Sequence, residues 1–296
     1  MSGNPFLRRM GFSPTDKVVI FHADDLGMCH ATNQAFADIV QAGTVRCGSA
    51  MVPCPWFNEI AAYARTHPEA DIGVHTTLTA EWRLYRWSPI STRDRESGLL
   101  DDEGYMWADV SSLHAHMDPR AALAELRAQV DRALDAGIDV THIDTHMGAV
   151  IHPALVEGYL QMASEYSVPV LLPRPNQEVI ERFGIPPSVA TMLTELEKDA
   201  TWPLFDHVVA LFGAPAPRRL EQYQRLLQEL SPGLICVIYH PIAPGDEGKA
   251  IMPEQDWEGR IADWEVFSGP AFREWLQASG IHAIGYRDLR DAMRSV

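Results

Sequence analysis

Cysteine is scarce in this sequence, and the four cysteines present form no metal-binding or redox pattern. Cys29, Cys47, Cys54 and Cys236 include no pair separated by two residues, the spacing of zinc fingers and of redox-active dithiols. The sequence therefore predicts neither a structural zinc site nor a disulfide framework. We expect free thiols in a reducing compartment.

Basic patches and long apolar segments are also missing. Lys and Arg form no extended cluster and the formal net charge is −16, which disfavours binding to nucleic-acid phosphates or to an anionic membrane surface. Residues 1–14 lack the apolar core of a signal peptide, and no apolar run is long enough to span a bilayer. We therefore expect a soluble, cytoplasmic protein with no nucleic-acid or membrane partner.

Short apolar runs alternate with segments of helical periodicity along the chain. The expected strands are 18–27, 44–52, 71–78, 140–148, 168–172, 234–241 and 281–286. The expected helices are 33–42, 56–65, 119–136, 153–165, 270–279 and one that starts at 287. This alternation predicts an α/β fold with parallel strands and right-handed crossovers. For a chain of 296 residues we expect one TIM-barrel-like (β/α) barrel domain over 1–296.

Two segments interrupt the barrel pattern. Residues 81–117 form a loop insertion in which Trp and Tyr are interleaved with Arg, and residues 176–231 form a helical excursion broken by prolines. Loops on the carboxyl-terminal face of such barrels hold substrates, and aromatic rings suit the apolar faces of sugars. The alternative for the first segment is a surface loop folded over its own aromatic cluster. The second segment is interpreted either as a lid or as an oligomer contact. The latter interpretation predicts a homodimer.

Two adjacent carboxylates, Asp24 and Asp25, follow the apolar run 18–23. A parallel strand that ends in this way delivers acids to the rim of a barrel, where the chain turns and both side chains can address one site. One carboxylate can then hold a metal while the other takes a proton. The alternative is that one of them is the N-cap of the helix that follows.

Histidines stand at the ends of later strands. His75 lies in the strand 71–78, and His240 ends the strand 234–241. His142, Asp144 and His146 alternate along one strand, which places all three on one face. A single histidine is more often a satisfied core residue than a ligand. Three polar residues at a period of two are hard to explain as core.

The polar set at the strand ends predicts a hydrolytic metal site. One carboxylate and two imidazoles suit a divalent ion and leave coordination positions open for water and substrate. Such a site activates water for hydrolysis of an amide or ester. Asp24 would take the proton of that water, and a protonated His240 would give one to the leaving nitrogen. Asp144 either orients a ligand histidine or joins the acid–base relay.

Five motifs resemble those of the YdjC/ChbG-type carbohydrate deacetylases. They are His-Ala-Asp-Asp-Leu-Gly at 22–27, Gly-Val-His at 73–75, Pro-Ile-Ser at 89–91 with Gly-Leu-Leu-Asp-Asp-Glu-Gly at 98–104, Thr-His-Ile-Asp-Thr-His at 141–146, and His240-Pro241. The resemblance implies a seven-stranded barrel that removes N-acetyl groups from amino sugars with a divalent metal, often magnesium; zinc is the other candidate. It makes Asp25, His75 and His146 the metal ligands, Asp24 the base, and His240 the acid or intermediate stabiliser.

The chain departs from the family pattern at four positions. His22 replaces the usual Asn, Gly148 and Val150 stand where further histidines are frequent, and Cys236 replaces a frequent Glu. These changes leave the metal triad intact and favour an acyl-amide substrate other than chitooligosaccharide. Two further functions compatible with the residues are a metal phosphoesterase and a catalytically silent sugar-binding barrel.

Overall fold

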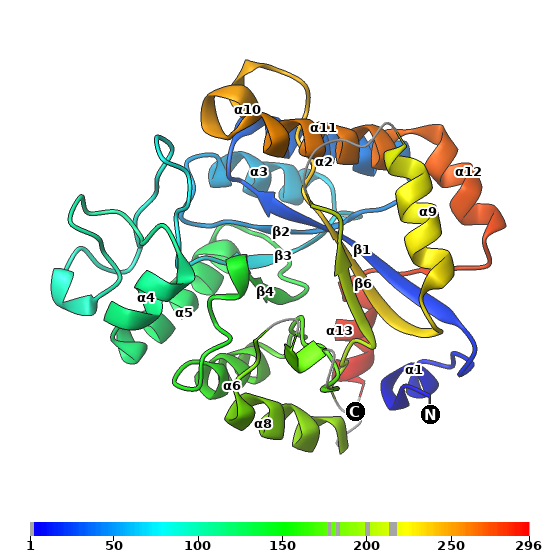
Figure 1. Ribbon diagram of the computed structural model, residues 1–296, viewed down its shortest axis with the longest axis horizontal. Helices are drawn as coiled ribbons and strands as arrows, with labels where there is room; N and C mark the ends of the chain where they lie inside the picture. Colours follow the sequence, from blue (N-terminus) through cyan, green and yellow to red (C-terminus); the bar gives the residue numbers. More distant parts are fainter. Residues whose placement is uncertain (1–2, 177–178, 182–183, 199–201, 213–217, 296) are drawn as a thin grey trace.

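The computed structural model describes residues 3–176, 179–181, 184–198, 202–212 and 218–295. Its centre is a curled parallel β-sheet with the strand order β4-β3-β2-β1-β6-β5, surrounded by helices (Figure 1). The strands of this path are β1 (Lys17–Leu26), β2 (Cys47–Ala50), β3 (Asp71–Thr76), β4 (Ile143–Thr145), β5 (His207–Ala210) and β6 (Gly233–Tyr239). Because every one of these strands pairs in parallel, their carboxyl ends meet at one rim.

The helices mostly follow strands and cover the outer face of the sheet, except that the first helix precedes β1. They are α1 (Pro5–Arg9), α2 (His30–Ala42), α3 (Phe57–Thr66), α4 (Val110–His116), α5 (Pro119–Asp135), α6 (Val156–Tyr166), α8 (Pro187–Lys198), α9 (Arg219–Glu229), α10 (Asp246–Ile251), α11 (Glu254–Ser268), α12 (Pro270–Ala278) and α13 (Tyr286–Arg294), with short 3₁₀ helices at η1 (Arg95–Ser97) and η2 (His146–Gly148). Within the described residues, each helix is too short or too polar to cross a lipid bilayer.

The alternation of side chains along β1 separates two cores. Val19 and Phe21 point outward and join a large apolar cluster with the helices, whereas Val18 and Ile20 point inward. The inward cluster also contains Phe6 and Leu7 from the region of α1 together with Cys236 and Tyr286. Since successive strand residues face opposite sides, the next inward residues of β1 are His22 and Asp24. The polar residues therefore sit at the top of the barrel interior.

The predicted α/β sheet is confirmed, but a closed barrel of seven full strands is not. The two-residue β7 (His282–Ala283) pairs with β1, beside the path of six strands. The expected strand 168–172 is represented by isolated bridges, Ile143 to Val170 and Pro173 to Phe205. These bridges lie between the edge strands β4 and β5, where regular ladders would close a barrel. The observed sheet is consistent with a TIM-like barrel.

The prediction of a helical excursion over 176–231 is wrong in one respect. Besides α8 and α9, this segment contains β5, which pairs with β6 and is part of the sheet. Residues 177–178, 182–183, 199–201 and 213–217 of the segment lie outside the described residues. The aromatic segment 81–117 enters between β3 and α5 and carries η1 and α4. The homodimer stays a prediction.

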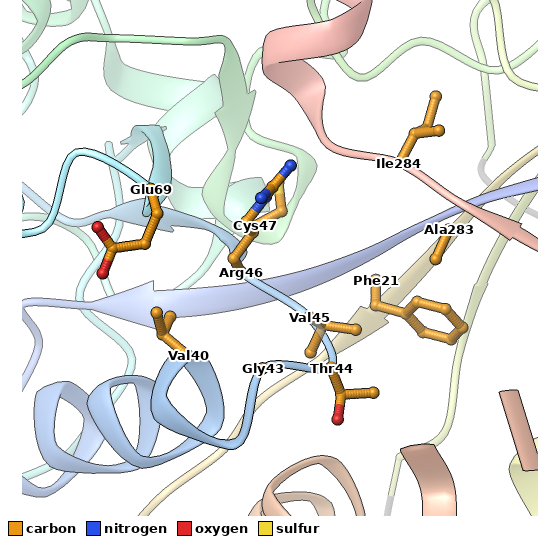
Figure 2. Close-up of a pocket in the computed structure, with 10 residues that line it drawn as sticks. All are labelled: Phe21, Val40, Gly43, Thr44, Val45, Arg46, Cys47, Glu69, Ala283 and Ile284. Atoms are coloured by element: carbon orange, nitrogen blue, oxygen red, sulfur yellow. The ribbon is translucent and has the colours of Figure 1, made fainter. Parts of the chain in front are cut away.

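A cavity of about 340 Å³ lies at the amino-terminal end of the sheet (Figure 2). Gly43, Thr44 and Arg46 line it from the turn before β2, and Glu69 lines it from the turn before β3. None of the predicted site residues lines this cavity. Since α/β barrels carry their active sites at the carboxyl ends of the strands, the functional site is expected at the opposite rim.

Candidate active site

Asp24 and Asp25 address the same site because the backbone of β1 is irregular there. The pairing of β1 with β2 shifts register between Ala23 and Leu26, and Asp25 has a φ of 66°. A positive φ is unfavourable for a residue with a Cβ, so this local strain is the cost of turning two adjacent carboxylates to one side. The alternative that either aspartate caps a helix is wrong, because α2 has Cys29 as its N-cap.

Asp25, His75 and His146 place three donor atoms close together. Asp25 Oδ1 lies 3.4 Å from His75 Nε2 and 3.4 Å from His146 Nδ1, and the two nitrogens are 3.2 Å apart. All three side chains are buried. Donors about 2.1 Å from one tetrahedral ion are separated by about 3.4 Å, so the observed spacing fits a shared divalent ion.

The far nitrogens of both histidines are held by carboxylates. His75 Nδ1 lies 2.7 Å from Asp144 Oδ2, and His146 Nε2 lies 2.9 Å from Glu81 Oε2. When the imidazole is neutral, the ionised carboxylate accepts its ring N–H, so the other nitrogen, which faces Asp25, is the one that can bind a metal. Of the two roles considered for Asp144, this contact favours the one in which Asp144 orients the ring of His75.

Arg260 sets the charge state of Asp25. Burial raises the pKa of this carboxyl, but the Arg260 guanidinium, whose Nη2 lies 2.8 Å from Oδ2, and contacts with both histidines hold the pKa well below its usual value. Within the described chain, Asp25 Oδ1 accepts no hydrogen bond. An ionised, buried carboxylate oxygen without a donor is expected of a metal ligand.

Asp24 lies beside the triad and between two imidazoles. Its Oδ2 is 3.8 Å from His75 Nε2 and 3.7 Å from His240 Nε2. Burial and the positive charge of Arg260 lower the pKa of His240, and its backbone N–H donates to Asp263. The lowered pKa favours the neutral imidazole, and the expectation of a protonated His240 stays a prediction. Asp24 and a neutral His240 can therefore each accept a proton.

Among the residues that the structure describes, two further buried groups have metal-ligand chemistry, and neither fits as well. They are His22, Cys47 and His142, and His22, Asp24 and Asp144. Both include His22, whose two nitrogens are engaged at 2.6 Å with Asp24 and at 2.7 Å with His142. These are hydrogen-bond lengths, shorter than the separation of two ligands on one ion.

The sequence did not reveal Glu81 or Arg260. Glu81 begins the aromatic segment only a few residues after β3. Its closeness to His75 in the sequence could have marked it as a candidate site residue. Arg260 lies on α11 and reaches Asp25 from far away in the sequence, and nothing local distinguishes it from the other arginines. Of the remaining predicted residues, Asp144 contacts His75 of the triad, and His240 lies 3.7 Å from Asp24.

A second, smaller cavity lies beside His240 and Arg260. It has a volume of about 140 Å³, and its lining includes Trp82, Phe212, His240 and Arg260. The Arg260 guanidinium lies 5.9 Å from the Trp82 ring centroid, which connects the triad to the aromatic wall. An apolar wall beside a polar reaction centre suits a ligand with one apolar face and one polar edge.

Comparison with known proteins identifies the family. The model of the YdjC-like protein family matches residues 18–278. The chain belongs to the YdjC-like family. This YdjC-like protein is 34% identical over 289 residues to a carbohydrate deacetylase of Thermus thermophilus, an alignment that covers 97% of this chain and 98% of the relative. The predicted resemblance is thereby confirmed.

Further comparisons agree on the length and fold of this YdjC-like protein. A carbohydrate deacetylase of Listeria monocytogenes serotype 4b is 31% identical over 276 residues, which are 92% of this chain and 99% of the relative. The crystal structure of a putative cellobiose-phosphate cleavage protein from Enterococcus faecalis superposes with a TM-score of 0.75 at 23% identity, covering 93% of this chain and 99% of that one. The latter similarity concerns the fold.

Proposed function

We propose that this protein is a metal-dependent deacetylase that removes an N-acetyl or related acyl group from an amino sugar. The observation that carries the proposal is the Asp25–His75–His146 triad with the free Oδ2 of Asp24 beside it. The names of the related carbohydrate deacetylases support the substrate class.

Asp25, His75 and His146 would hold the ion. A bound divalent ion would lower the pKa of water toward about 7 and polarise the acyl carbonyl. The resemblance suggests Mg²⁺, yet imidazole donors suit zinc and other late transition metals, whereas Mg²⁺ prefers oxygen ligands. Two imidazoles against one carboxylate therefore favour Zn²⁺ or a similar ion.

Asp24 and His240 would move the proton during hydrolysis. Oδ2 of Asp24 takes a proton from the attacking water as the water oxygen bonds to the acyl carbon. The C–N bond then breaks, and the amine nitrogen needs one proton to leave. His240 Nε2, 3.7 Å from the same oxygen, is placed to receive that proton and pass it to the nitrogen. A neutral His240 suits this transfer, because it needs no proton of its own at the start.

The phosphoesterase alternative has less support. A phosphate ester needs unpaired cations to balance its charge. Arg260 pairs with Asp25 and Arg219 pairs with Asp263, so both arginines that line the adjoining cavity already face carboxylates. Trp82 and Phe212 in the same cavity suit the apolar face of a sugar ring instead.

The test is acetate release from a panel of N-acetylated mono- and oligosaccharides. The protein is first stripped with a chelator and then assayed with Mg²⁺, Zn²⁺, Mn²⁺ or Co²⁺, with an aryl phosphate ester as a parallel substrate. We expect acetate release only with a metal and little phosphate release. Faster phosphate release would favour the phosphoesterase. Sugar binding without acetate release at any metal loading would favour the silent barrel.

A further inference from the structure

A chain of hydrogen bonds runs through the barrel interior beneath Asp24. His22 Nδ1 lies 2.6 Å from Asp24 Oδ1, and His22 Nε2 lies 2.7 Å from His142 Nε2. Thr141 Oγ1 lies 2.9 Å from His142 Nδ1. His22, Thr141 and His142 are fully buried. Buried imidazoles are costly unless their nitrogens are paired, and here all four ring nitrogens have a partner.

The chain fixes the direction of the bond to Asp24. An ionised carboxylate only accepts, so His22 donates its Nδ1–H to Oδ1. His22 Nε2 then either accepts a hydrogen bond from His142 or donates one to it. The Thr141 hydroxyl can donate or accept and completes the chain in both cases. The hydrogen bond from His22 to Asp24 is therefore the same in either arrangement.

The ring of His142 is closely packed between Gly73 and Tyr286. A Cβ added at Gly73 would lie 2.5 Å from Cε1 of His142 and 2.6 Å from both ring nitrogens. Tyr286 stacks on the same imidazole with ring centroids 3.8 Å apart and an interplanar angle of 13°. Tyr286 also packs edge-on against His22, with centroids 5.5 Å apart. Gly73 and Tyr286 thus prevent the imidazole pair from moving away from Asp24.

The consequence is that the two oxygens of Asp24 have different tasks. Oδ1 is bound from below by His22, while Oδ2 faces His75 and His240 at 3.8 and 3.7 Å. We propose that His22 and His142 are positioning residues that anchor Oδ1 of Asp24 and so keep Oδ2 aimed at the water it deprotonates. This inference rests on the proposed deacetylase function.

The kinetic test compares two substitutions of His22. H22L removes the donor but keeps an apolar side chain of similar bulk, and we expect kcat to fall about 10- to 100-fold with unchanged KM and metal affinity. In H22N the side-chain amide can still donate to Asp24 but no longer contacts His142, so kcat should be restored only in part. The control is I20A, which removes buried volume from the interior cluster without touching the chain and should lower thermal stability but not kcat.

A spectroscopic test needs no substrate. A short N–H bond from imidazole to carboxylate gives a far-downfield proton resonance, which we expect in the wild type and I20A. The resonance should vanish in H22L and H22N and shift in H142F, which keeps the stacking on Tyr286.

Two results overturn the inference. One is full kcat in a folded H22L, and the other is loss of metal affinity in H22L, which would mean that His22 acts on the metal site instead. If the wild type releases acetate from no sugar at any metal loading, the proposed function fails separately. In that case only the proton resonance tests the inference. Its absence from the wild type would contradict the hydrogen bond by which His22 anchors Asp24.

Discussion

Replacing Asp24 with asparagine should abolish turnover while leaving the metal site intact. The amide keeps the shape of the side chain, and its oxygen can still accept the hydrogen bond from His22. The nitrogen that replaces Oδ2 cannot take a proton from water. A general base contributes about 10²- to 10⁴-fold to a rate, so kcat should fall by that factor, or about 3 to 5 kcal/mol in activation free energy.

The assay for this variant has two readouts. Acetate release under single-turnover conditions gives the chemical rate, and plasma mass spectrometry gives the metal content per chain. Asp102→Asn is the matched control, since this aspartate is fully exposed on the aromatic segment. The reasoning is refuted if Asp24→Asn keeps more than about a tenth of kcat, because the loss would then be smaller than a general base supplies. Loss of metal from Asp24→Asn would place this residue among the ligands instead.

Four other variants test the surroundings of the site. His146→Ala should abolish metal binding measured by calorimetry, and Glu81→Gln should weaken it by about 10- to 100-fold because His146 loses its orienting carboxylate; wild-type affinity in either case would contradict the assigned triad. Arg260→Met should raise the pKa of Asp25, so metal binding should be lost at a higher pH than in the wild type when affinity is followed from pH 8 downward; an unchanged pH dependence would count against this role of Arg260. Leu126→Ala, in the packed face of α5, should lower the unfolding free energy by about 2 to 5 kcal/mol in a denaturant titration, with the metal affinity of the folded fraction unchanged.

The acidic and histidine residues could be predicted because each stands at the end of a parallel strand. Parallel pairing brings those ends to one rim, so Asp25, His75 and His146 meet although they are far apart in sequence. The period of two also predicted that His142 faces the same side as His146. The period of two did not predict how deep each side chain lies in the barrel. Because a strand rises about 3.3 Å per residue, His142 lies one layer below the triad and contacts His22 there.

The missed features depend on tertiary contacts. Arg260 reaches Asp25 from a helix more than two hundred residues away, and a single sequence contains no sign of that approach. The strand β5 has only four residues and lies in a region that prolines made look irregular. The opposite error occurred at 168–172, where an apolar run predicted a strand but the backbone makes only isolated bridges. Short strands are decided by their neighbours as much as by their own residues.

The most direct test of the account is the anomalous diffraction of crystals grown with Zn²⁺ or Mn²⁺. The account predicts one peak about 2.0 to 2.3 Å from Asp25 Oδ1, His75 Nε2 and His146 Nδ1, and none beside His22. A peak between His22, Cys47 and His142 would contradict both the metal site and the anchoring of Asp24. The absence of any ordered ion at the triad, in crystals of protein that releases acetate, would contradict the metal-dependent mechanism itself.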